Sequence, residues 1–99
     1  MDIKELTQAM HTFVEKKGWD APDSPKPQTP KNLASSLSIE VAEILEHFQW
    51  TEDIHDKPAL AEELADVVLY LLQLAWVSEI DLERAILDKL EKNQDRIWK

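Results

Sequence analysis

Two pairs of acidic residues have the spacing of a metal site built from carboxylates. Glu40 and Glu43 form the first pair, Glu63 and Asp66 form the second, and nineteen residues (44–62) separate the pairs. In a helix, residues three apart lie about one turn apart on the same side, so each pair places two carboxylates on one helix face. Hard divalent cations such as Mg²⁺ take oxygen ligands and keep positions open for substrate phosphates. The pattern therefore indicates metal-assisted phosphate-ester chemistry.

The composition is that of a small acidic protein without cysteine. Its 99 residues suit a single domain, residues 1–99, with a modest core, which favours a homo-oligomer. A net charge of −9 argues against a nucleic-acid polymer or an anionic membrane as partner unless a cation intervenes. The absence of cysteine is compatible with a reducing cytosol, and the sequence shows neither an apolar leader nor a run of ~18 apolar residues. We expect a soluble cytoplasmic protein.

The placement of glycine and proline predicts an all-α domain. Only one glycine and five prolines occur, and four of the prolines lie between Pro22 and Pro30. The first helix is expected from Asp2, which forms a capping box with Glu5, to near Gly18. Three more helices are expected: from Thr29-Pro30 to about Trp50, from Asp56-Lys57-Pro58 onward, and from a cap at Asp81.

The acidic pairs border the expected core faces of the second and third helices. Glu40, Glu43, His47 and Trp50 follow one another at spacings of 3, 4 and 3, and Glu63, Asp66 and Tyr70 repeat the arrangement. The residues expected to form the core are Ile3, Leu6, Met10, Phe13, Leu33, Leu37, Val41, Ile44, Phe48, Leu60, Leu64, Val67, Leu71, Ala75, Leu82, Ile86, Leu90 and Ile97. The segment 67–77 is apolar nearly all round, so it should be central or covered by a partner subunit.

Several ordered motifs resemble one family. The sequence reads SIEVAEILEHFQW over residues 38–50 and EELADVVLY over residues 62–70. It also has Trp19 before the proline-rich segment, PKNL over residues 30–33 and KLEKN over residues 89–93. Together these resemble the MazG-like nucleoside triphosphate pyrophosphohydrolases, and especially their small dCTP pyrophosphatase branch. The resemblance covers nearly the whole chain.

The resemblance implies a four-helix-bundle-type domain assembled as a homodimer or homotetramer. It implies hydrolysis of a nucleoside triphosphate, with dCTP as a preferred substrate, to the monophosphate and pyrophosphate as part of nucleotide-pool cleaning. Water would attack the α-phosphorus, and Mg²⁺, or Mn²⁺ as a substitute, would lower the pKa of the water and neutralise phosphate charge. The metal ligands would be Glu40, Glu43, Glu63 and Asp66. Either Glu40 or Glu43 would also be the catalytic group that accepts the proton of the water.

Further residues are candidates for substrate contacts. By analogy with the dCTP-preferring members, Trp19 and Trp50 would line the base pocket, and Tyr70 would lie on the sugar side. Residues suited to phosphate contacts are Lys31, Lys89, Lys92, Asn93 and Arg96. The chain departs from the family where the first helix has Met10 and His11 in place of a frequent histidine. It also has Ile97-Trp98 where the family often has a tyrosine-proline pair.

Other interpretations compete with the enzyme. One acidic pair alone would be interpreted as a solvated helix face, and the two pairs in register with aromatic neighbours favour a site. His47 lies among these acids, where histidine is typically a hydrogen-bonding neighbour of ligands, so it is not counted as one. A di-iron carboxylate bundle requires Glu-x-x-His motifs, and neither acidic pair contains one. The remaining alternative is a non-enzymatic helical interaction module whose apolar third helix binds a partner.

Overall fold

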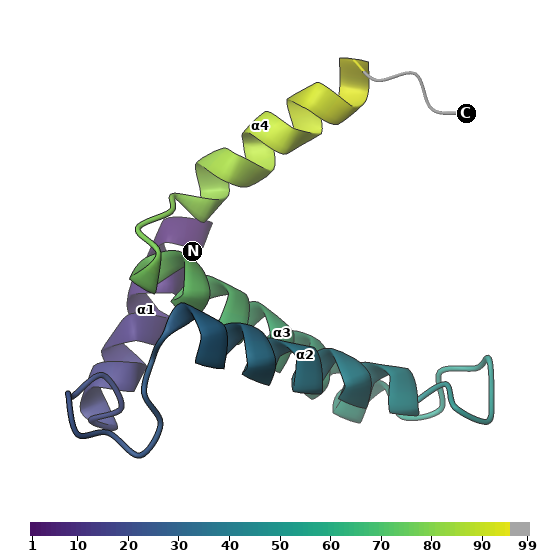
Figure 1. Cartoon of the computed structure of the whole chain (residues 1–99). Coiled ribbons are helices and arrows are strands. Elements are labelled where there is room, and N and C mark those ends of the chain that lie inside the picture. Colours follow the sequence, from purple (N-terminus) through teal and green to yellow (C-terminus); the bar gives the residue numbers. More distant parts are fainter. Residues whose placement is uncertain (96–99) are drawn as a thin grey trace.

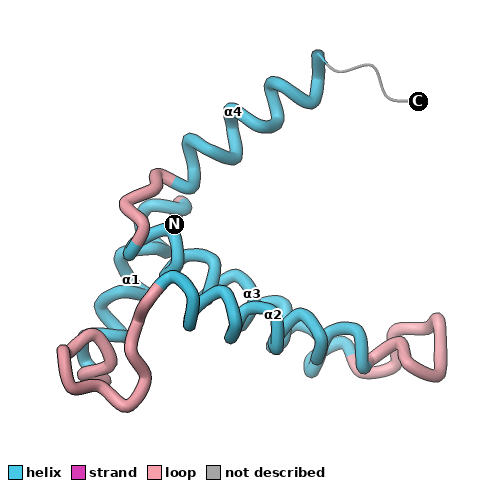
Figure 2. Tube along the Cα trace, viewed as in Figure 1, coloured by secondary structure: helices cyan, strands magenta, loops and turns pink. Residues whose placement is uncertain are grey.

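The described part of the chain is entirely helical. The computed structural model describes residues 1–95, which form four helices and no strand (Figures 1 and 2). The helices are α1 (Ile3–Lys16), α2 (Pro30–Glu46), α3 (Lys57–Val77) and α4 (Leu82–Asp95). The prediction of an all-α domain with four helices is therefore confirmed. No helix among the described residues is long and apolar enough to cross a membrane.

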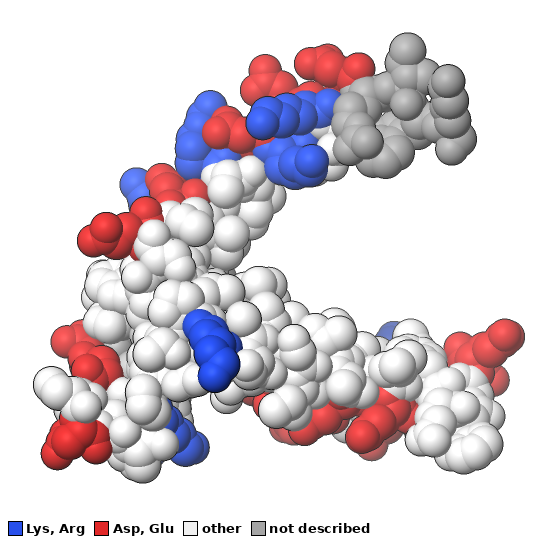
Figure 3. All heavy atoms as spheres, in the orientation of Figure 1, with Lys and Arg blue, Asp and Glu red and all other residues white. Residues whose placement is uncertain are grey.

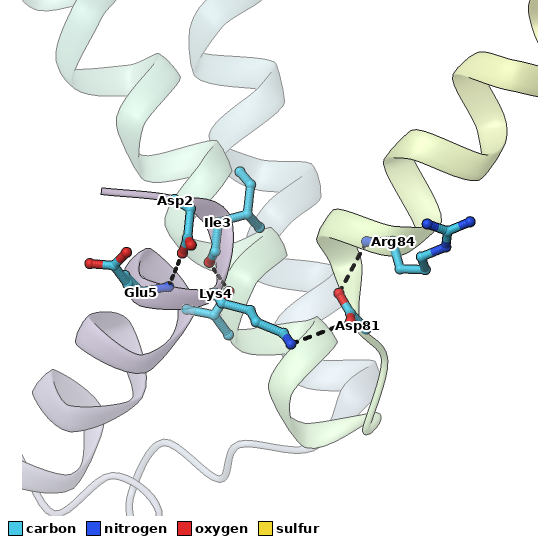
Figure 4. Close-up of polar contacts among 7 residues, drawn as sticks. Asp2, Ile3, Lys4, Glu5, Asp81 and Arg84 are labelled. Carbon is cyan, nitrogen blue, oxygen red and sulfur yellow. Dashed lines mark hydrogen bonds and ion pairs between the residues drawn. The ribbon is translucent and has the colours of Figure 1, made fainter.

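Each helix begins at a side-chain cap that the sequence predicted. Asp2 Oδ1 accepts a hydrogen bond from the backbone N–H of Glu5 at 2.8 Å, and Asp81 Oδ1 accepts one from Arg84 at 3.0 Å (Figure 4). Thr29 and Asp56 cap α2 and α3 in the same way, and a proline follows in the first turn of both helices. These bonds satisfy backbone donors that the first turn of a helix leaves unpaired.

The helix ends follow from backbone geometry. Helix α1 stops just before Gly18, whose φ of 72° lies in the left-handed region that glycine adopts readily. Helix α2 stops at Glu46, earlier than the predicted end near Trp50. The backbone N–H groups of residues 47–49 bond to carbonyls three residues earlier, so tight turns replace the α-helical pattern there. This early end places Trp50 in the α2–α3 loop.

Two helix contacts hold the fold together. Helices α2 and α3 run side by side along most of their length, and α1 crosses the C-terminal half of α3 (Figure 1). The core between α1 and α3 consists of Met10, Val14 and Leu72, with Trp19 and Leu82 packed against it. Leu72 is 1% exposed, so its side chain is almost fully buried in this contact.

The predicted core faces are only partly buried in the single chain. Met10, Leu33 and Ala75 are buried as predicted, and Val14, Leu72 and Gln73 are buried although they were not assigned to the core. Several other predicted core residues on all four helices are exposed, because no other part of residues 1–95 covers them. These are Leu6, Phe13, Val41, Leu64, Leu71, Ile86 and Leu90. Ile97 lies outside the described residues.

The chain is more open than an ordinary monomer of its size. It exposes 7728 Å², whereas a compact 11.5 kDa protein would expose about 5,800 Å². Its radius of gyration is 15.9 Å, against about 13 Å for a compact domain of this length. Helix α4 packs mainly against α1 and points away from the α2–α3 pair (Figure 1). An ion pair of 3.9 Å between Lys4 and Asp81 joins α1 to the start of α4 (Figure 4).

We predict that Leu72→Ala lowers the free energy of unfolding by about 2–5 kcal/mol, because it leaves a cavity where α1 crosses α3. Urea unfolding followed by circular dichroism measures this change. Lys16→Ala, at the exposed end of α1, is the control and should change stability by about 0.5 kcal/mol or less. Equal stabilities of the two variants would show that the α1–α3 contact is not the core.

Candidate active site on the α2–α3 pair

The contact between α2 and α3 brings the two acidic pairs together. Glu40 and Glu43 lie in the C-terminal half of α2, and Glu63 and Asp66 lie in the N-terminal half of the antiparallel α3. Three of the four side chains are half-buried, and Asp66 is exposed. From the side shown in Figure 3, acidic side chains gather along the lower edge of this helix pair.

The electrostatics of Glu40 show that the four carboxyl groups are neighbours. Burial, followed by the negative charges of Glu43 and Asp66, raises the pKa of Glu40 above its ordinary value of 4.5. A hydrogen bond with Glu43 and the charge of Glu63 raise this pKa further. The carboxylate oxygen Glu40 Oε2 is buried and has no hydrogen-bond partner, and Glu63 Oε2 is buried against the imidazole of His47. A group of carboxylates with such a buried oxygen suits a hard divalent cation.

A histidine touches one of these acids. His47 Nε2 lies 2.5 Å from a carboxylate oxygen of Glu63, and both side chains are half-buried. The two atoms are close, but their angles are not those of a hydrogen bond, so the contact is an ion pair. It therefore compensates the charge of Glu63 only when the imidazole is protonated.

A di-iron site would require Glu-x-x-His motifs on helices. The only Glu-x-x-His sequence, Glu52 to His55, lies in the α2–α3 loop and not on a helix.

A second group of possible ligands was not predicted. The ligand atoms of His11, Glu15 and Asp20 lie within 4.8 Å of one another, and no other trio among the described residues is as close. The imidazole of His11 stacks on Trp76 with centroids 4.2 Å apart, and the amide of Gln73 lies 3.4 Å from His11 Nδ1. The i, i+4 spacing of His11 and Glu15 was the available sequence signal. Both carboxylates are exposed, so a solvated ion pair accounts for this group.

The two tryptophans proposed for a base pocket lie at opposite ends of α2. Trp19 is in the segment before α2, and Trp50 is in the loop after it. The 17 residues of α2 span about 25 Å. Trp19 is half-buried against the α1–α3 core, whereas Trp50 is 89% exposed. A single chain therefore does not bring these two rings into one pocket.

Tyr70 does line a pocket close to the acids. This pocket has a volume of about 430 Å³ and lies between the proline-rich segment, α2 and α3. Ser36 and Tyr70 both line it, and each is one helical turn from an acid of the site, Glu40 or Asp66. Lys26 also lines this pocket, and the sequence analysis missed it because it lies in an irregular segment without helical spacing.

The residues predicted to contact phosphates are not gathered at the acids in one chain. Lys31 is exposed in the first turn of α2. Lys89 and Lys92 are exposed on α4, where Asn93 is half-buried, and α4 packs mainly on α1. From the side shown in Figure 3, most visible Lys and Arg side chains lie on α4, away from the acidic edge of the α2–α3 pair. Arg96 lies outside the described residues.

Comparisons with known proteins agree on one family. The MazG-like family model matches residues 35–98. The dCTP pyrophosphatase 1 of Rattus norvegicus is 32% identical over 95% of this chain, and that of Homo sapiens is also 32% identical over 95%. The chain spans 58% of the length of these two relatives. The crystal structure of a pyrophosphatase from Archaeoglobus fulgidus is similar with a TM-score of 0.80 and 42% identity, covering 97% of this chain and 92% of that one.

We predict that Glu40→Gln stabilises the protein more as the pH rises, when EDTA is present. Because the pKa of Glu40 is raised in the folded state, its contribution to stability is fully present below pH 4.5 and is lost as the pH rises through the raised pKa. The difference in melting temperature between the variant and the wild type should therefore grow from acidic to neutral pH. Glu46→Gln, on the exposed side of the same helix, is the control. A difference that stays constant with pH would contradict the clustering of the four acids.

Proposed function

The chain belongs to the MazG-like family, and from that premise we propose that it hydrolyses a nucleoside triphosphate to the nucleoside monophosphate and pyrophosphate. The observation that carries the proposal is the convergence of four carboxyl groups from α2 and α3, where burial and the neighbouring negative charges raise the pKa of Glu40. The names of the similar proteins, two dCTP pyrophosphatases and one pyrophosphatase, support the same reaction.

The donor set of the site fits Mg²⁺, with Mn²⁺ as a substitute. Glu40, Glu43, Glu63 and Asp66 offer only oxygen ligands, and the buried Glu40 Oε2 has no hydrogen-bond partner. The metal would supply a Lewis acid that lowers the pKa of the attacking water and neutralises negative charge on the phosphates. The trio of His11, Glu15 and Asp20 includes an imidazole nitrogen, which is a ligand type that Mg²⁺ does not prefer.

The protein groups at this site would handle the proton of the attacking water. Glu40 and Glu43 lie one helical turn apart within the acidic group. We propose that one of these two carboxylates accepts the proton of the water, as the general base for attack at the α-phosphorus. His47 would compensate part of the charge of Glu63 when its imidazole is protonated.

We propose dCTP as a substrate and a role in nucleotide-pool cleaning. The names of the rat and human relatives support dCTP. The pocket that Tyr70 lines is next to the acids and would receive the sugar. Indole rings such as those of Trp19 and Trp50 can stack on a base, which is worth about 1–3 kcal/mol per base. The cytoplasmic location and the exclusion of nucleic-acid polymers and membranes stay predictions.

The active form is proposed to be a homodimer or homotetramer. Exposed apolar residues recur at i, i+4 spacing on α2 (Val41, Leu45) and on α3 (Leu64, Val68), and Leu45 is 70% exposed. Exposed apolar side chains on two neighbouring helices support an interface between copies of the chain. Within one chain, Trp50 is far from Trp19 and the cations of α4 are far from the acids. In an oligomer, Trp50 of a second copy could approach Trp19 of the first, and the α4 cations of the second copy could approach the acids of the first.

We predict that ³¹P NMR of the protein with Mg²⁺ and dCTP shows the monophosphate and pyrophosphate, and that EDTA abolishes the reaction. Glu63→Gln should reduce kcat/KM by about 100-fold or more, since it removes a metal ligand. Glu15→Gln, in the trio on α1, is the matched control and should keep wild-type activity.

Release of orthophosphate with the diphosphate would mean attack at the γ-phosphorus and would overturn the proposed mechanism. Loss of activity in Glu15→Gln but not in Glu63→Gln would move the metal site to the trio. No turnover of any of the four deoxynucleoside triphosphates at high protein concentration would favour the non-enzymatic interaction module, which the exposed apolar surface also fits.

We predict that Leu45→Asp disrupts the oligomer and, with it, the activity. A buried carboxylate in an apolar interface is strongly unfavourable, so sedimentation equilibrium should show monomers or unfolded chain where the wild type forms dimers or tetramers. Glu46→Asp, at the next position along α2, is the control and should leave the assembly unchanged. A wild type that sediments as a monomer while fully active would contradict the composite site.

A further inference from the structure

The proline-rich segment between α1 and α2 places a cation on an aromatic ring. Lys26 Nζ lies 4.6 Å from the centroid of the Trp19 ring. Phe13 contacts the same ring edge-to-face, with centroids 5.5 Å apart and an angle of 84° between the planes. The indole also packs against the core of Met10, Val14 and Leu72. Trp19 is thus fixed from several sides, and the ammonium group of Lys26 lies over one of its faces.

The backbone around Lys26 is fastened to itself and to α2. The hydroxyl of Ser24 accepts a hydrogen bond from the backbone N–H of Lys26 at 2.9 Å, and the side-chain amide of Gln28 donates to the carbonyl of Lys26 at 2.9 Å. The side-chain amide of Asn32, in the first turn of α2, donates to the carbonyl of Pro27 at 3.0 Å. These bonds fix where the side chain of Lys26 begins, while its four-carbon stem can still turn.

Lys26 contacts the ring of Trp19 and also lines a pocket. Besides lying over Trp19, it lines the pocket of about 430 Å³ that also contains Ser36 and Tyr70. That pocket adjoins the acidic group, because Ser36 and Tyr70 are each one helical turn from Glu40 or Asp66. Among the described residues that line this pocket, Lys26 is the only lysine or arginine.

We propose that Lys26 is a substrate-binding residue that leaves the face of Trp19 and binds the triphosphate next to the acidic group. This inference rests on the proposed function. A substrate with several negative charges needs a cation in a chain whose net charge is −9. An exposed cation–π contact is weaker than a charge-assisted hydrogen bond to phosphate, so the ammonium group binds the phosphate in preference to the indole. The same movement uncovers the indole face of Trp19 for a base.

The test compares Lys26→Met with Lys17→Met in steady-state kinetics and in calorimetric titrations. Methionine keeps an apolar chain and removes the charge. Lys17 is the matched control, because it also makes a cation–π contact, with its Nζ 5.7 Å from the ring centroid of Phe13. Unlike Lys26, Lys17 does not line the pocket. In Lys26→Met we expect KM for dCTP to rise about 10-fold with kcat within about twofold, since the lost contact exists in the ground state as well. Lys26→Arg, which keeps the charge, should restore KM to within about threefold of wild type.

Inorganic tripolyphosphate with excess Mg²⁺ separates a phosphate contact from a structural effect. Lys26→Met should bind this probe about 10-fold more weakly than the wild type does, and its binding of deoxycytidine, which has no phosphate, should not weaken. Equal weakening for both probes, or a KM equal to that of Lys17→Met, would overturn the role of Lys26 while leaving the enzyme intact. A wild type that neither hydrolyses dCTP nor binds tripolyphosphate would instead refute the proposed function and this inference with it.

Discussion

The mutual repulsion of four carboxyl groups on α2 and α3 is the constraint on which the site depends. Like charges disfavour one another, and burial together with the negative charges of the other three acids raises the pKa of Glu40 in the folded chain. The packing of α2 along α3 holds the acids together in spite of it. Among the described residues, His47 makes an ion-pair contact with one of these acids, Glu63, when its imidazole is protonated. A divalent cation would turn the repulsion into attraction, so the same packing that strains the metal-free chain prepares it to bind metal.

The sequence predicted best what short-range geometry decides. Asp2, Thr29 and Asp81 each cap a helix through a bond to the backbone three residues ahead, which depends on the local chain alone. The convergence of the acidic pairs agrees with the sequence pattern, because both pairs border the apolar sides of two neighbouring helices and these sides tend to pack together. Their role as metal ligands and in catalysis stays a prediction.

Burial and the irregular segment were beyond local signals. The helical period placed Val41 and Leu64 in the core, yet both are exposed in the single chain, since periodicity shows which side is apolar and not what covers it. Gln73 is 0% exposed although it is polar, because its amide meets the imidazole of His11 from another helix. Lys26 reaches Trp19 through turns and side-chain bonds that have no repeating pattern in the sequence.

The open shape links these observations. The chain exposes 7728 Å² and extends α4 away from α2 and α3. Its apolar faces are therefore uncovered, and the cations of α4 do not lie beside the acids. A compact monomer would have to fold α4 back toward the α2–α3 pair. The proposed association would cover the apolar faces without moving α4, and it would be a simpler way to bring positive charge to an acidic site. Lys26 is different in this respect, because it lines a pocket with Ser36 and Tyr70, which are each one helical turn from an acid of the same chain, so its proposed role requires no partner subunit.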